Sequence, residues 1–280
     1  MSYATLISTA DLAAQLHDPG WIVFDCRHNL SDPEAGHRAY LEGHIPGAHF
    51  LHLDRDLSGS ASGNNGRHPL PDPEHFAARL AALGMDQAMQ AVAYDDAGGI
   101  FASRLWWMLR WVGHSRVAVL DGGLQKWIRE EHPVTHTLPV ARTGGFRAAV
   151  HEVPVQATDL LPRLGSPDLL ILDARSPERF RGVGETLDPV GGHIPGAVNR
   201  FFRDNLDRSG CFKAPEVLRE DFLSLLAGLG SGAVVHQCGS GVTACHNLLA
   251  MEIAGLSGSR LYPGSWSEWC ADPRRPVATD

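Results

Sequence analysis

Cys238 stands at a point where the sequence changes from the pattern of a strand to the pattern of a helix. Residues 233–235 (Ala-Val-Val) form the end of an apolar run that is typical of a buried strand. Ala244, Leu248 and Met251 then recur at the spacing of one helical face. A thiol at such a turn is placed for nucleophilic chemistry, because it lies at the positive end of the helix dipole.

Small residues follow this cysteine and favour an anion there. Gly239, Ser240 and Gly241 allow several backbone N–H groups to turn toward one point, the Cys238 sulfur. The start of a helix favours negative charge at the same place. A structural cysteine buried after a strand is the alternative, but burying a thiol does not require flanking glycines. The loop therefore indicates a thiolate nucleophile.

The sequence that must position this loop occurs twice. Segment 22–27 (Ile-Val-Phe-Asp-Cys-Arg) is similar to segment 171–175 (Ile-Leu-Asp-Ala-Arg). Segment 43–48 (Gly-His-Ile-Pro-Gly-Ala) is identical to segment 192–197, which lies 149 positions later. Repeats this far apart indicate two copies of one large folding unit rather than a solenoid.

A third pair of segments, 120–127 and 262–269, extends the repeat with an offset of 142 positions. Each copy has the order strand, loop, Gly-His-Ile-Pro-Gly-Ala, helix, strand, helix, strand. This order predicts an α/β domain with a mostly parallel sheet flanked by helices. We therefore expect domains at 1–130 and 158–280, joined by a linker at 131–157 that is rich in Pro and Gly.

The two copies differ at the nucleophile. The predicted strand 91–95 (Ala-Val-Ala-Tyr-Asp) of the first copy corresponds to 233–237 of the second. At this offset Cys238 falls on Asp96, so the first copy has no sulfur at the turn. Only the second copy is expected to carry out chemistry.

Segment 238–244 (Cys-Gly-Ser-Gly-Val-Thr-Ala) closely resembles the active-site loop of the rhodanese-like sulfurtransferases, specifically the mercaptopyruvate sulfurtransferase branch. Together with the repeats, the resemblance covers essentially the whole chain. It implies tandem rhodanese-like domains, of which the first is inactive. It also implies that the loop residues line the substrate site, namely Gly239, Gly241, Val242 and Thr243.

The reaction that this resemblance implies is sulfur transfer through a persulfide on Cys238. The thiolate takes the outer sulfur of a small anionic donor. It then passes that sulfur to a thiol, such as thioredoxin or glutathione, or to cyanide. We expect no metal and no organic cofactor in this reaction.

In the mercaptopyruvate branch, the loop serine works with a histidine and an aspartate of the first domain. The resemblance places these roles on Ser240, on His44 in the first Gly-His-Ile-Pro motif, and on Asp32. His44 also has a structural interpretation, because a histidine before Ile-Pro-Gly can fix a turn, as expected of its twin His193. Asp32 lies in Ser-Asp-Pro, which is also typical of an ordinary turn.

The family binds the donor's charged group with arginines that precede the second Gly-His-Ile-Pro motif. Arg179 matches the first of them, and a guanidinium suits a carboxylate or a thiosulfonate. The family's second arginine, in a Pro-Glu-Pro-Arg stretch, has no counterpart in segment 184–190. Arg181 is a candidate replacement, whereas Arg175 is expected to belong to the Asp-x-Arg motif that it shares with Arg27.

The residues after the cysteine favour 3-mercaptopyruvate as the donor. Thiosulfate is a dianion, and thiosulfate sulfurtransferases of the animal type carry basic residues there, whereas Gly239 and Ser240 are neutral. The Ser240 hydroxyl can bond a carbonyl or relay a proton. Because the missing second arginine argues the other way, a thiosulfate:cyanide sulfurtransferase is the alternative.

Two other kinds of cysteine chemistry fit this loop less well than sulfur transfer, and a sulfur carrier is a further alternative. Rhodanese-fold phosphatases and arsenate reductases need an arginine six positions after the cysteine, where this chain has Ala244. A redox pair of Cys238 and Cys245 is not favoured, because about two helical turns separate them. The intact loop argues against a binding module that keeps only the fold, and a persulfide carrier that delivers sulfur to a protein partner is the alternative of another class.

Composition restricts the partners. A net charge of −8 argues against nucleic acid and anionic membranes. The apolar runs are too short to span a bilayer, and the first residues lack the pattern of a secretory signal. The five cysteines show no C-x-x-C spacing, and the fifteen histidines form no H-x-x-x-H pair on a convincing helix. We therefore expect a cytoplasmic protein without a metal site or a disulfide framework.

Overall fold

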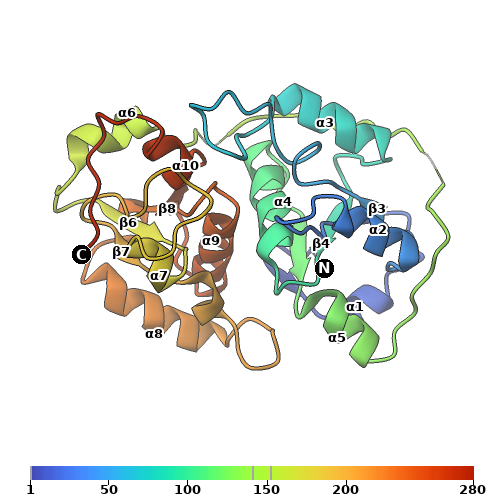
Figure 1. Cartoon of the computed structure of the whole chain (residues 1–280). Coiled ribbons are helices and arrows are strands. Elements are labelled where there is room, and N and C mark those ends of the chain that lie inside the picture. Colours follow the sequence, from blue (N-terminus) through green and yellow to red (C-terminus); the bar gives the residue numbers. More distant parts are fainter. Residues whose placement is uncertain (1, 141, 152) are drawn as a thin grey trace. The chain divides into compact units, whose positions relative to one another are not determined.

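The computed structural model describes residues 2–140, 142–151 and 153–280, and the chain divides into two compact units (Figure 1). Unit 1 consists of Met1–Gly59, Leu70–Val153 and Arg208–Cys211, and unit 2 consists of Ser60–Pro69, Pro154–Asp207 and Phe212–Asp280. Each unit thus includes a short segment from the other half of the sequence, which the contiguous domains proposed above do not contain. Ala141 and Glu152, which fall in the expected linker, lie outside the described residues.

The sheet of unit 1 is parallel, with the strand order β1, β5, β4, β2, β3. In that order the strands span Leu6–Ile7, Val117–Leu120, Gln90–Tyr94, Trp21–Asp25 and His49–Phe50. The α-helices are α1 Thr9–Ala13, α2 Ala35–Glu42, α3 Pro73–Ala82, α4 Ile100–Trp111 and α5 Gly123–Arg129. Every residue of the central strand β4 is buried, as is typical of a parallel strand covered on both faces.

Unit 2 repeats this plan with the strand order β7, β6, β8, β9, again parallel. These strands span Val198–Asn199, Leu170–Asp173, Val234–Gln237 and Arg260–Leu261. The helices are α6 Ala157–Leu160, η1 Leu161–Arg163, α7 Pro177–Phe180, η2 Phe202–Asn205, α8 Pro215–Leu226, η3 Ser231–Ala233, α9 Thr243–Ile253 and α10 Ser265–Trp269. The predicted α/β class with two mostly parallel sheets is therefore confirmed.

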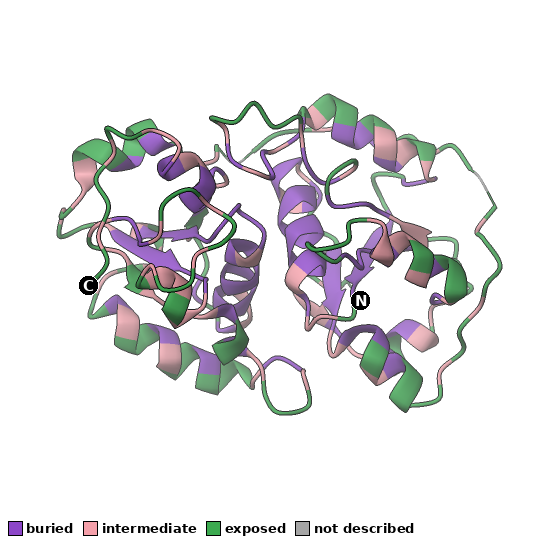
Figure 2. Cartoon of the chain, viewed as in Figure 1, coloured by how far each residue is buried: buried purple, intermediate pink, exposed green. Residues whose placement is uncertain are grey.

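The helix predicted after Cys238 is α9. Ala244, Leu248 and Met251 are all buried, as their spacing predicts. Most of α9 is coloured as buried in Figure 2. Among the described residues, no helix combines the length and the apolar character needed to cross a bilayer.

A buried ion pair holds the same loop in each unit. In unit 1 the Arg27 guanidinium contacts the Asp25 carboxylate at 2.7 Å and donates to the Gly43 carbonyl at 2.7 Å. In unit 2 Arg175 contacts Asp173 at 2.6 Å and donates to the Gly192 carbonyl at 2.7 Å. The Asp-x-Arg motif therefore ties the end of a strand to the start of Gly-His-Ile-Pro, and Arg175 has this structural role.

In unit 1 the loop after the central strand is filled by a carboxylate of its own chain. The buried Asp95 side chain accepts hydrogen bonds of 2.8–2.9 Å from four backbone N–H groups, those of Ala97, Gly99, Phe101 and Ala102. Burial raises the pKa of Asp95, although these four bonds act in the opposite direction. The backbone N–H groups of this loop that would face a bound anion are thus already bonded to Asp95.

Substitution of Asp95 by alanine should lower the free energy of unfolding by about 3 kcal/mol, because it removes the acceptor for several buried N–H groups. Urea unfolding followed by circular dichroism measures this loss. The neighbouring Asp96→Ala is the matched control, since Asp96 is exposed and should change stability by less than about 0.5 kcal/mol. Equal effects of the two substitutions would contradict this account of the loop.

Candidate functional site

Cys238 lies directly after β8, at the start of the loop that leads into α9. Its side chain is 2% exposed, and the Gly241 N–H donates to the Cys238 Sγ at 3.1 Å. Gly241 has a φ of +76°, and a Cβ atom there would lie 2.3 Å from the Pro263 carbonyl oxygen. A side chain at position 241 would therefore displace the amide that contacts the sulfur.

Hydrogen bonds to the first residues of α10 fix the backbone around the cysteine. The Cys238 N–H donates to Ser265 Oγ at 3.1 Å, and the Trp266 N–H donates to the Cys238 carbonyl at 3.0 Å. The Ser267 N–H donates to the Gly239 carbonyl at 2.9 Å. These bonds leave the Gly241 N–H directed at sulfur, where it stabilises a negative charge together with the start of α9.

The remaining predicted loop residues connect the cysteine to this helix. Gly239 and Gly241 flank Ser240, Val242 is the N-cap residue of α9, and Thr243 is its first residue. The five cysteines of the chain are present as thiols, and the Cys245 Sγ lies 3.4 Å from the Gly241 carbonyl oxygen.

The imidazole that contacts Ser240 belongs to His68. Its Nδ1 lies 2.7 Å from Ser240 Oγ, and both side chains are buried. His68 comes from Ser60–Pro69, the segment of the N-terminal half that belongs to unit 2. Gly66 packs so closely on this unit that a Cβ atom there would lie 2.8 Å from the Gly264 carbonyl oxygen.

Two guanidinium groups lie against Gly239, next to the cysteine. A Cβ atom built on Gly239 would be 2.9 Å from Arg67 Nη2 and 3.4 Å from Arg179 Nη1. Arg67 lies in the same segment as His68, and its N–H donates to Ser267 Oγ at 3.0 Å. Arg179 lies on the short helix α7. The site therefore contains a second arginine, but it does not come from the stretch in which the family carries one.

Carboxylates from segment 184–190 hold both guanidinium groups. Arg67 forms an ion pair with Asp188, and Arg179 contacts the same carboxylate at 3.2 Å. Arg179 also donates two hydrogen bonds of 3.0 Å to Glu185. The two arginines are thus matched by two carboxylates, and the local net charge is close to zero.

These carboxylates have opposite pKa shifts. Burial raises the pKa of Asp188, because the attraction of Arg67 does not compensate for the lost hydration and Glu185 repels it. Burial acts in the same direction on Glu185, but backbone N–H groups, beginning with that of Leu187, and the Arg179 guanidinium outweigh it and lower its pKa. Glu185 accepts two hydrogen bonds from Arg179, whereas Asp188 accepts one.

His44 and Asp32, the partners assigned to Ser240 from the sequence, lie in unit 1. The buried His44 ring contacts the Tyr40 and Thr137 carbonyl oxygens at 2.8 and 3.1 Å and stacks on the Tyr40 ring. Its twin His193 contacts the Phe180 carbonyl at 2.9 Å and stacks on the Phe180 ring. Equivalent contacts in both copies favour the structural interpretation of His44.

Asp32 is exposed and forms an ion pair with the exposed Arg38. Arg181, the candidate replacement for the second arginine, is exposed.

The sequence analysis did not identify His68 and Arg67 as candidate site residues. The only signal for them was an Arg-His pair in a loop rich in Gly and Ser, which has no periodicity that would mark it.

The chain was compared with known proteins. A family model described as "Rhodanese-like domain" matches residues 8–130 and 156–272. A "Probable 3-mercaptopyruvate sulfurtransferase" of Pseudomonas aeruginosa is 50% identical over 282 residues, which cover 100% of this chain and 99% of that protein. A "Putative thiosulfate sulfurtransferase" of Mycobacterium tuberculosis is 38% identical over 280 residues, covering 97% of this chain and 96% of that protein.

The fold is also similar to solved structures. A crystal structure from Escherichia coli, described under 3-mercaptopyruvate sulfotransferases, superposes with a TM-score of 0.83 and 33% sequence identity. The match covers 94% of this chain and 99% of that chain. Relatives named for mercaptopyruvate and for thiosulfate thus share this architecture.

Proposed function

This chain belongs to the two-domain rhodanese-like sulfurtransferases, and on that premise we propose that Cys238 transfers the sulfur of 3-mercaptopyruvate to a thiol or to cyanide. The observation that supports this most is the environment of one sulfur atom. The Gly241 N–H donates to the Cys238 Sγ, and the adjacent Ser240 contacts the His68 ring at 2.7 Å.

The first half-reaction forms a persulfide. The Cys238 thiolate attacks the sulfur of the donor, an S–S bond forms, and the C–S bond of mercaptopyruvate breaks with its electron pair on carbon. The resulting enolate takes a proton and leaves as pyruvate. We propose that Ser240 and His68 relay the protons that leave the donor thiol and reach the enolate.

The second half-reaction restores the thiolate. An acceptor thiolate or cyanide attacks the outer sulfur of the persulfide, and the S–S bond breaks with its electrons on the Cys238 sulfur. The Gly241 N–H then stabilises the leaving thiolate as it forms. We propose thioredoxin or glutathione as acceptors and a reducing cytoplasm as the location, because the five cysteines show no C-x-x-C spacing that would indicate a disulfide framework.

The charge balance supports mercaptopyruvate over thiosulfate. Arg179 and Arg67 offer N–H groups to an anion, but Glu185 and Asp188 neutralise much of their field. A monocarboxylate gains directional hydrogen bonds from such a site, whereas a compact dianion gains less from a site of near-zero net charge.

Steady-state kinetics with both donors tests the choice of donor. We expect kcat/KM to favour 3-mercaptopyruvate by more than about tenfold, which corresponds to roughly 1.4 kcal/mol of transition-state binding. A ratio in favour of thiosulfate would assign the protein to the thiosulfate:cyanide alternative. If neither donor turns over while labelled sulfur stays on Cys238, the protein acts as a persulfide carrier.

Replacement of Arg67 by glutamine should raise the KM for mercaptopyruvate about tenfold or more, because a charged hydrogen bond to the carboxylate is lost. Arg67→Lys retains the charge near Asp188 and should show a smaller increase. Arg181→Gln is the matched control, since Arg181 is exposed, and its KM should be that of the wild type. A KM unchanged in Arg67→Gln would remove Arg67 from the donor site.

A further inference from the structure

Segment 182–191 of unit 2 is a short loop that buries two carboxylates. Its ends meet at Gly182 and Gly191, where a Cβ atom on Gly191 would lie 2.7 Å from the Gly182 carbonyl oxygen. Most residues between them are exposed, but the side chains of Glu185 and Asp188 are only 4% and 2% exposed. Buried charges are unfavourable unless polar partners hold them, so the partners of these two carboxylates define what the loop does.

Asp188 bridges the two guanidinium groups that lie next to the nucleophile. Its Oδ1 accepts a hydrogen bond from Arg67 Nη1, and its Oδ2 accepts one from Arg179 Nη2 at 3.2 Å. Other nitrogens of the same groups lie nearest to Gly239, because a Cβ atom built there would be 2.9 Å from Arg67 Nη2 and 3.4 Å from Arg179 Nη1. Asp188 thus fixes both arginines while each directs a further nitrogen toward the loop of Cys238.

Glu185 fixes Arg179 in the same way. It accepts hydrogen bonds of 3.0 Å from Arg179 Nε and Nη2, and this leaves Nη1 to face Gly239. Three backbone N–H groups of the loop also donate to the Glu185 carboxylate, at 2.8–3.2 Å. An anionic donor beside Cys238 can therefore meet Arg67 Nη2 and Arg179 Nη1 while both carboxylates stay in place.

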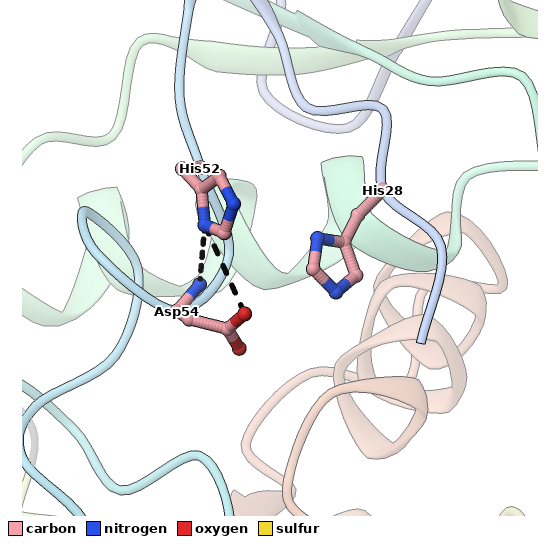
Figure 3. A group of neighbouring side chains, drawn as sticks. All are labelled: His28, His52 and Asp54. Carbon is pink, nitrogen blue, oxygen red and sulfur yellow. Dashed lines mark hydrogen bonds and ion pairs between the residues drawn. The ribbon is translucent and has the colours of Figure 1, made fainter. Parts of the chain in front are cut away.

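Low exposure makes the charge of these carboxylates effective. In unit 1 the Asp54 carboxylate lies 3.9 Å from His52 Nδ1, next to the His28 ring (Figure 3), but the Asp54 side chain is 41% exposed and water screens its charge. Asp188 and Glu185 have little contact with water. Their charge therefore acts strongly on an anion bound at the two arginines.

We propose that Asp188 and Glu185 determine the charge class of the sulfur donor. They direct N–H groups of the two arginines toward Gly239, and their negative charge favours a monoanionic donor over a dianionic one. The inference rests on the proposed function, because it takes Arg67 and Arg179 as the binding site of the donor's anionic group. Repulsion by a fixed charge is proportional to the charge of the ligand, so each carboxylate opposes a dianion twice as strongly, in free energy, as a monoanion.

Calorimetric titration of Cys238→Ser protein with pyruvate and with sulfate, at one ionic strength, tests the proposal without turnover. At neutral pH pyruvate is a monoanion and sulfate is a dianion. Asp188→Asn in this background should shift the ratio of the two affinities toward sulfate by about threefold or more, because it removes one buried negative charge. Any poorer positioning of the arginines weakens both anions and largely cancels in the ratio.

Three further variants make the test specific. Arg67→Gln should weaken both anions by about tenfold or more, which identifies the site that is titrated. Glu178→Gln is the matched control, since Glu178 is exposed on α7 and its replacement removes the same charge; the affinity ratio should remain that of the parent. Glu185→Gln should shift the ratio toward sulfate, as Asp188→Asn does. It keeps the test decisive if circular dichroism shows that Asp188→Asn is unfolded.

An affinity ratio that neither Asp188→Asn nor Glu185→Gln shifts would overturn the proposal, and so would an equal shift in Glu178→Gln. Absence of anion binding that depends on Arg67 would overturn it as well. Failure of the proposed function is a separate result, because Cys238 could transfer no sulfur from either donor while the calorimetric ratio still moved toward sulfate.

Discussion

Replacement of Cys238 by serine should reduce sulfur transfer from either donor by about 10⁴-fold or more, to the level of the uncatalysed reaction. The serine hydroxyl is not ionised at neutral pH, and it cannot form a persulfide. The fold should persist, because the side chains differ by one atom and the Gly241 N–H can donate to oxygen as it does to sulfur.

The measurement combines steady-state rates with intact-protein mass spectrometry. Wild type treated with donor should gain the mass of one sulfur atom, and Cys238→Ser should gain none. Cys245→Ser is the matched control, because its sulfur lies on the next helix, against the Gly241 carbonyl. Transfer activity retained by Cys238→Ser, or a persulfide mapped to Cys245, would refute the assignment of the nucleophile.

Replacement of His68 by alanine should lower kcat for mercaptopyruvate by about 10²-fold or more, with a smaller effect on KM. Cleavage of the C–S bond leaves a carbanion that needs a proton, and the His68 ring lies 2.7 Å from the Ser240 hydroxyl next to the nucleophile. Sulfur abstraction from thiosulfate releases sulfite and needs no such proton. The effect on the thiosulfate reaction should therefore be much smaller.

Two variants make this test specific. Ser240→Ala combined with His68→Ala should cost no more than the larger single effect, because the two side chains act as one unit. His44→Ala should keep the kcat of the folded protein but lower the free energy of unfolding by about 2 kcal/mol, since it removes two buried hydrogen bonds. A loss of kcat in His44→Ala, with none in His68→Ala, would reinstate the assignment made from the sequence.

The fold and the nucleophile were predictable because their signals are local. A buried strand, a cysteine followed by small residues, and a helix with apolar residues at a spacing of three to four follow one another within 233–253, and this run of chain contains β8, the loop and α9. The repeat of Asp-x-Arg and Gly-His-Ile-Pro-Gly-Ala likewise predicted two sheets of one plan. Each of these elements is specified by neighbours in the sequence.

The groups around the nucleophile were decided by tertiary structure. His68 is 172 positions from Ser240, and it reaches the serine because the loop with Gly66 packs against Gly264. No periodicity marks such a loop, so the motif histidine His44 was the more visible candidate.

The position of Arg67 was likewise not predictable from the sequence pattern. The sequence determined that the family's second arginine is missing from 184–190, but only the folded chain supplies a guanidinium from elsewhere and pairs it with Asp188 of that very stretch. Contacts between distant segments depend on how both backbones pack, and this is not encoded in the pattern of either segment alone. The chemistry was therefore specified locally, by Cys238 and its loop, whereas His68 and Arg67, the groups proposed to protonate and bind the donor, are brought to it by packing.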